Sequence, residues 1–105
     1  MNAVERLWRA LAARNWPSAA AQLHPHAAIE RPHGAGRLDV GELVTAWRMT
    51  PDDQEVEVRE MLTASKSVAV LARIRRDGTT LHCAAFYELH DGLIALGTEL
   101  WVPQG

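Results

Sequence analysis

The 105-residue chain has little cysteine and no long apolar run. Cys83 is its single cysteine, so no disulfide can form within the chain. No segment approaches the roughly 18 consecutive apolar residues needed to cross a bilayer. Residues 1 to 13 mix charged with apolar side chains, unlike the apolar core of a secretory signal. These absences predict a cytoplasmic protein without a membrane partner.

Basic runs and recognisable cofactor motifs are also missing. The net charge is −2, and the densest basic group is Arg73, Arg75 and Arg76. Nucleic-acid binding driven by phosphate neutralisation is therefore not expected. No glycine-rich phosphate loop occurs, so no cofactor is predicted. His24 and His26 flank a proline and have no cysteine or aspartate cluster nearby, so no metal site is predicted either.

The composition is that of a globular protein. Hydrophobic residues make up 48% of the chain and charged residues 23%, which argues against disorder. A chain of this length can bury one core but not two. We expect a single domain over residues 1 to 105.

The first half of the chain has the signals of three helices. A second, shorter helix is predicted over residues 16 to 23, with Pro17 in its first turn and Pro25 after its end. Asp39 followed by Glu42 is a capping-box signal for a third helix. The first helix is predicted from apolar residues at helical spacing, which are Val4, Leu7, Trp8 and Leu11.

The remaining segments alternate with the period of a β-strand. A short strand over residues 26 to 31 is closed by Pro32 and the loop "HGAGR". Asp77-Gly78 and Asp91-Gly92 are hairpin turn signals in the second half. Four strands are predicted there, over residues 56 to 62, 67 to 76, 79 to 89 and 93 to 102. Since only the helices can cover one face of this antiparallel meander, the predicted fold is α+β, with a curved sheet wrapped around three helices.

Three segments together resemble one superfamily. They are "ARNWPSAAAQLHPHAAIERPHG", the helix capped by Asp39, and "FYELHDGLIALGTELW". In this order they resemble the SnoaL-like and nuclear transport factor 2-like superfamily, which includes ketosteroid isomerases and polyketide cyclases. The resemblance implies a cone-shaped α+β barrel with one pocket at its open end. It also implies a homodimer that forms through the outer face of the sheet.

The resemblance does not extend to the catalytic groups of ketosteroid isomerase. An ungapped comparison places Leu7 at the position of the family's tyrosine and Arg31 at the position of its aspartate base. The second acid falls on Ala84 or Ala85. An arginine stays protonated and cannot abstract a proton, so steroid isomerisation is not expected.

The same resemblance, combined with strand alternation, selects the candidate pocket residues. It implies that Gly97, Glu99 and Trp101 of the last strand face inward, as does Arg31. Alternation places His33 on the side of Arg31, and Tyr87 on an inward face. The predicted ligand-binding residues are Arg31, His33, Trp47, Tyr87, Glu99 and Trp101. If Arg31 and Glu99 meet, we expect a buried ion pair, since an unpaired buried charge is costly.

Several functions remain open at this point. Arginine binds carboxylates in a bidentate manner, so a small organic molecule with a carboxylate or carbonyl group is the expected ligand. Chemical transformation of isomerase, cyclase or lyase type would use His33 or Glu99 as a general base. Alternatively, the Arg31–Glu99 pair is structural and aromatic rings fill the cavity. The rival function is a non-catalytic, dimeric protein-association module that uses the outer sheet face, where Phe86 and Leu100 would form an apolar patch.

Overall fold

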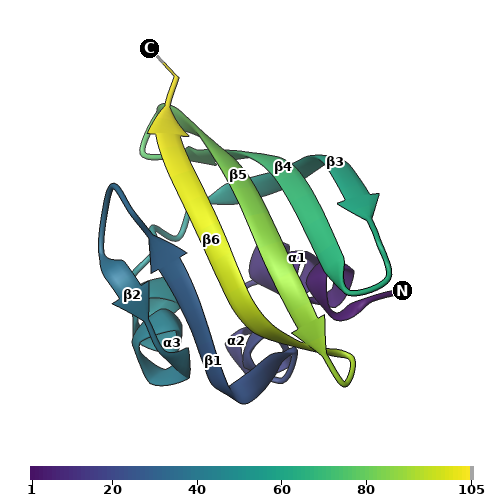
Figure 1. The fold of residues 1–105 in the computed structure, drawn as a ribbon. Helices are drawn as coiled ribbons and strands as arrows, with labels where there is room; N and C mark the ends of the chain where they lie inside the picture. Colours follow the sequence, from purple (N-terminus) through teal and green to yellow (C-terminus); the bar gives the residue numbers. More distant parts are fainter. Residues whose placement is uncertain (105) are drawn as a thin grey trace.

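The computed structural model describes residues 1–104 as three helices and one six-stranded sheet (Figure 1). The helices are α1 (Ala3–Ala12), α2 (Trp16–Ala20) and α3 (Val40–Arg48). The strands are β1 (Leu23–Arg31), β2 (Gly36–Leu38), β3 (Glu55–Thr63), β4 (Ser67–Arg76), β5 (Thr79–His90) and β6 (Leu93–Pro103). This arrangement confirms the predicted α+β class.

The sheet is mixed, and its strands follow the order β2-β1-β6-β5-β4-β3. β1 runs parallel to β6, and every other neighbouring pair is antiparallel. The sheet curves without closing, and the helices lie against one of its faces (Figure 1). That face and the helices enclose the core, and they also enclose the candidate site.

The second and third helices begin where the sequence predicts, and the first begins after a cap that was not predicted from the sequence. The Asn2 side chain caps α1 by accepting a hydrogen bond from the Glu5 backbone N–H at 2.8 Å. Asp39 and Glu42 form the predicted capping box of α3, with hydrogen bonds of 2.8 and 3.0 Å. The α1 residues that enter the core are Ala3, Val4, Leu7, Trp8 and Ala10.

Three expectations about the segment after α1 were wrong. The second helix ends at Ala20 instead of residue 23, because β1 already begins at Leu23. β1 includes Pro25, and the pairing with β6 shifts register between Leu23 and Ala28, so the proline interrupts no regular ladder. The predicted loop contains a short strand, β2, which pairs with the end of β1.

The C-terminal meander forms as predicted. Asp77-Gly78 and Asp91-Gly92 both have positive φ angles, at 51° and 72° and at 51° and 77°. Two consecutive residues with positive φ give the hairpin turn that matches the twist of its strands. The register of β4 with β5 is continuous, and β5 pairs along β6 with one shift near Leu89.

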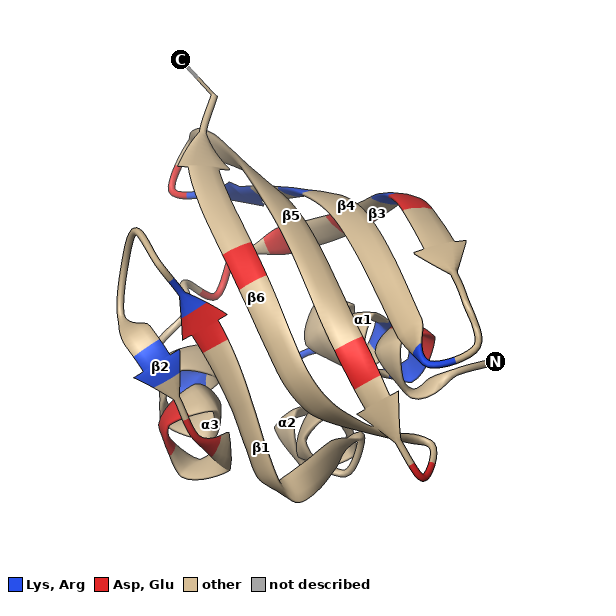
Figure 2. Ribbon diagram, viewed as in Figure 1, with Lys and Arg blue, Asp and Glu red and all other residues tan. Residues whose placement is uncertain are grey.

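The two faces of the sheet differ sharply. β4 and β5 bury alternate residues against the helices, namely Val68, Val70, Ala72, Ile74, Cys83, Ala85 and Tyr87. β5 and β6 each carry one acidic residue and neither Lys nor Arg (Figure 2). The large apolar side chains exposed on the outer face include Leu71, Phe86, Leu96 and Leu100. Among residues 1–104, the helices are all too short to be membrane spans.

Candidate functional site

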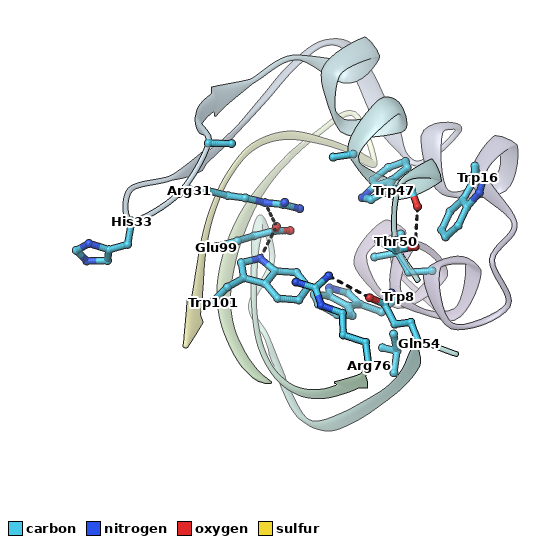
Figure 3. Close-up of a pocket in the computed structure, with 15 residues that line it drawn as sticks. Trp8, Trp16, Arg31, His33, Trp47, Thr50, Gln54, Arg76, Glu99 and Trp101 are labelled. Atoms are coloured by element: carbon cyan, nitrogen blue, oxygen red, sulfur yellow. Dashed lines mark hydrogen bonds and ion pairs between the residues drawn. The ribbon is translucent and has the colours of Figure 1, made fainter. Parts of the chain in front are cut away.

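A cavity of about 220 Å³ lies between the helices and one end of the sheet (Figure 3). Aromatic side chains supply much of its wall, and charged groups gather on the side formed by the strands. The residues that matter for its chemistry are Trp8, Arg31, Trp47, Arg76, Glu99 and Trp101. Two shallower grooves of about 320 and 400 Å³ lie elsewhere, but neither contains a comparable group of converging charges.

Glu99 is the buried acid of this site, with 5% of its surface exposed. Its Oε1 accepts hydrogen bonds from Arg31 Nε at 3.0 Å and from Trp101 Nε1 at 3.1 Å. Its Oε2 accepts a hydrogen bond from the Tyr87 hydroxyl at 2.5 Å. Three donors therefore hold the carboxylate, and the predicted ion pair with Arg31 is present.

Sheet geometry brings these four side chains together. Glu99 and Trp101 are two residues apart on β6, so both point to the inner face. Tyr87 pairs with Gly97 across β5 and β6, and its ring packs against Gly97, where there is no side chain to obstruct it. A Cβ atom on Gly97 would lie 2.7 Å from both Tyr87 Cδ1 and Ile29 Cδ1. Glycine at this position thus lets the tyrosine reach Glu99.

Burial controls the protonation of the two other titratable groups beneath the cavity. Burial, followed by the charge of Glu99 and its hydrogen bond, raises the pKa of Tyr87 well above its usual value. Burial and Glu99 also raise the pKa of the Cys83 thiol, although Arg31 opposes the change. Tyr87 is therefore a neutral donor, and Cys83 is an unreactive thiol.

Arg31 has a different environment, because it reaches from the end of β1 to the edge of the cavity. Its side chain is 21% exposed, and its Cζ lies 5.2 Å from the centre of the Trp101 ring. Only Nε hydrogen-bonds to the part of the chain that the structure describes, and the terminal nitrogens make no such bond to residues 1–104. The terminal N–H groups are thus available to a ligand oxygen.

The other predicted site residues have different positions. Trp47 forms part of the cavity wall and stacks on Trp16, with ring centres 6.4 Å apart. Tyr87 lies behind Glu99 and does not line the cavity. His33 lies in the exposed turn after β1, and its ring points away from Arg31 and Glu99 (Figure 3). β1 ends at Arg31, so His33 does not continue the inward side of the strand, although it is among the residues that line the cavity.

The sequence interpretation missed Arg76, the last residue of β4. Arg76 Nη1 donates a hydrogen bond to Gln54 Oε1 at 3.3 Å, and its Cζ lies 5.9 Å from the centre of the Trp101 ring. Alternation could have found it, since Ile74 and Arg76 share the inward side of the strand. Within residues 1–104, no three His, Cys, Asp or Glu side chains are grouped as metal ligands.

The profile of the SnoaL-like domain matches residues 4–97. The chain belongs to the SnoaL-like domain family. Its NTF2-like cone is also seen in a candidate ketosteroid isomerase from Kribbella flavida, with 24% identity, a TM-score of 0.88, and coverage of 98% of this chain and 76% of that one. No curated protein sequence matches the chain.

Other solved structures with this fold belong to proteins named for different functions. An LEH-like epoxide hydrolase from Mycobacterium tuberculosis has 19% identity and a TM-score of 0.74, covering 94% of this chain and 79% of that one. IdmH from Streptomyces antibioticus, a candidate polyketide cyclase, has 15% identity and a TM-score of 0.82, with coverage of 94% and 88%. At these identities the likeness establishes the fold, and one fold hosts many activities.

Proposed function

We propose that this SnoaL-like protein binds a small organic molecule that presents a carboxylate or carbonyl oxygen to Arg31. The main support is that the nitrogens of the Arg31 guanidinium have different environments. Glu99 fixes Nε at 3.0 Å, whereas the terminal nitrogens have no hydrogen-bond partner in residues 1–104. Holding the guanidinium in place before the ligand arrives lowers the entropic cost of binding.

The size and wall of the cavity indicate the rest of the ligand. A volume of about 220 Å³ lies below the roughly 300–1,000 Å³ of drug-sized sites, so the ligand is small. Trp8, Trp47 and Trp101 offer apolar surface to its body. An aromatic or compact aliphatic acid suits both the apolar wall and the cationic edge.

The arrangement supports binding better than proton-transfer catalysis. Both Glu99 oxygens accept hydrogen bonds from protein donors, which occupy three of about four lone-pair positions. The ring of His33, at the edge of the cavity, points away from Arg31 and Glu99 (Figure 3). Neither of the two candidate general bases is therefore free and directed at the space where a ligand would lie.

Calorimetric titration with phenylacetate, an aromatic monocarboxylate that fits the proposed ligand class, tests this function. Removing the guanidinium in Arg31→Gln should weaken binding about 10- to 100-fold, the usual effect of losing hydrogen bonds to a charged group. Arg37→Gln is the matched control, since Arg37 lies on β2 with an exposed side chain paired to Glu30. Equal affinities in the two variants would contradict the proposal.

A second proposed function is association through the outer sheet face, as a homodimer. Its support is the exposed apolar surface of β4, β5 and β6, where Phe86 is 49% exposed. A groove of about 320 Å³ in this surface is lined mainly by apolar side chains, including Leu62, Leu71 and Leu100. Contiguous apolar surface of this kind marks an interface more often than a solvated face. We also propose that residues 1 to 105 form a single domain and that the protein is cytoplasmic.

A further inference from the structure

The site contains a second guanidinium that the proposed carboxylate contact with Arg31 does not explain. Arg76 reaches the cavity from the end of β4 and is half-buried. It lies across the hollow from Arg31, and both guanidinium groups lie over Trp101, with Cζ-to-ring distances of 5.2 and 5.9 Å (Figure 3). Trp101 therefore lies within cation–π distance of two cations.

The two arginines differ in how their charge is compensated. Arg31 forms an ion pair with Glu99. Arg76 has only the neutral Gln54 Oε1 as a side-chain partner, at 3.3 Å, and forms no ion pair with any carboxylate of residues 1–104. Asp77, in the turn after β4, and Asp53, in the loop before β3, are both exposed, and the Asp77 backbone N–H donates a hydrogen bond to Asp53 Oδ2 at 3.0 Å.

These facts give the cavity an excess of one positive charge. Arg31 and Arg76 each contribute one, Glu99 removes one, and the remaining lining residues are uncharged apart from His33, whose ring points outward. A single negative charge on the ligand restores neutrality. A neutral ligand leaves the excess in place, and a dianion reverses its sign. Charges in a partly enclosed site interact more strongly than in water, so this difference should affect affinity.

We propose that Arg76 is a specificity-determining residue that selects a monoanionic ligand, whose acidic group lies beside Trp101 between the two guanidinium groups. This inference rests on the proposed function, because it takes the ligand to be bound at Arg31. Beyond that function, it specifies that the ligand carries one negative charge and that Arg76 selects for this charge.

Phenylacetate with one negative charge and phenylacetamide with none have nearly the same shape and separate charge from fit. Phenylmalonate adds a second carboxylate on the same carbon and carries two negative charges. The unmodified protein should bind phenylacetate at least about tenfold more tightly than phenylacetamide, and no more weakly than phenylmalonate. Arg76→Gln should reduce the preference for phenylacetate over the amide about tenfold, whereas Arg76→Lys should keep part of it. Arg75→Gln is the matched control, since it removes the same charge from the neighbouring, exposed residue of β4.

The results of this experiment can overturn the role of Arg76 without overturning ligand binding at Arg31. If Arg76→Gln and Arg75→Gln have equal preferences while Arg31→Gln loses binding, the role of Arg76 is overturned and the proposed function stands. Tighter binding of phenylmalonate than of phenylacetate would overturn the charge match. If the unmodified protein binds none of the probes at millimolar concentration, both proposals fail. Should Arg76→Gln not fold, the probe preferences of the folded Arg76→Lys variant and the unmodified protein decide.

Discussion

The Tyr87 hydroxyl and the Arg31 guanidinium bind opposite oxygens of the same carboxylate, Glu99, at 2.5 and 3.0 Å. The tyrosine comes from β5, the glutamate from β6 and the arginine from the end of β1. This link ties the centre of the sheet to the mouth of the cavity. The buried tyrosine and the ligand-facing arginine therefore depend on the same acid.

Glu99→Gln should destabilise the protein by about 2 kcal/mol, because Arg31 loses its partner and the new amide places N–H donors against other donors. Urea unfolding measures this change in the free energy of unfolding. Glu30→Gln provides the comparison, because Glu30 forms an exposed ion pair with Arg37 at 3.3 Å. Its loss should cost less than about 1 kcal/mol. Similar losses in the two variants would show that burial adds nothing to the Glu99 pair.

Tyr87 is the only tyrosine in the chain, so its ionisation can be followed by ultraviolet absorbance. Burial and the charge of Glu99 raise the pKa of its hydroxyl in the folded protein. The unfolded chain should titrate near pH 10, and the folded protein should form phenolate only at higher pH. The associated stability is complete below pH 10, and is lost as pH rises toward the folded pKa.

Absorbance at 295 nm and near-ultraviolet circular dichroism, recorded together from pH 8 to 12, give the test. Phenolate should appear only as the folded signal disappears. The chain in concentrated guanidinium chloride serves as the reference for a free tyrosine. A midpoint near pH 10 with the folded signal intact would show that Tyr87 is exposed to solvent.

Gly97→Ala should destabilise the protein by about 1–3 kcal/mol, because overpacking forces neighbouring groups to move. The added Cβ would lie 2.7 Å from Ile29 Cδ1 and Tyr87 Cδ1. Gly41→Ala in α3 is the contrasting variant, since its Cβ meets nothing closer than 3.6 Å. That change should stabilise the protein by about 0.4–1 kcal/mol. Thermal unfolding compares them, and a neutral Gly97→Ala would contradict the close packing of Tyr87.

The apolar outer face should make the protein dimeric at micromolar concentration. Phe86→Glu places a charge in the centre of this face and should give a monomer in sedimentation velocity experiments. Met49→Glu is the control, since Met49 is 79% exposed in the turn after α3, away from the outer face. A monomeric unmodified protein would rule out this interface at that concentration.

Local sequence signals predicted most of the fold. Apolar residues at helical spacing located α1, the Asp39–Glu42 capping box located α3, the two Asp-Gly pairs located the turns of the meander, and alternation placed Tyr87 on the inner face of β5. β2 was missed because "GRL" is too short to alternate, and its strand character depends on pairing with β1. The start of β1 was placed too late, after Pro25, because a proline usually interrupts a strand. In the structure a shift in register between Leu23 and Ala28 accommodates this proline within β1.

The site was predicted less completely than the fold. The resemblance brought Arg31 and Glu99 to the same pocket, and the two form an ion pair in the structure. His33 does line the cavity, but from a turn and not from the strand that alternation assumed, and this turn closes with a hydrogen bond from Gly34 N–H to Arg31 O at 3.0 Å. Arg76 was overlooked because three arginines near a turn resemble a solvated surface, although only one of them lines the cavity.

A crystal structure of the protein with phenylacetate would show directly whether Arg31 binds the carboxylate of a ligand in the cavity. The carboxylate should lie within hydrogen-bond distance of the terminal nitrogens of Arg31, with the ring against the tryptophans and the Arg31–Glu99 contact retained. A carboxylate bound elsewhere, with Arg31 turned into solvent, would contradict the proposed function.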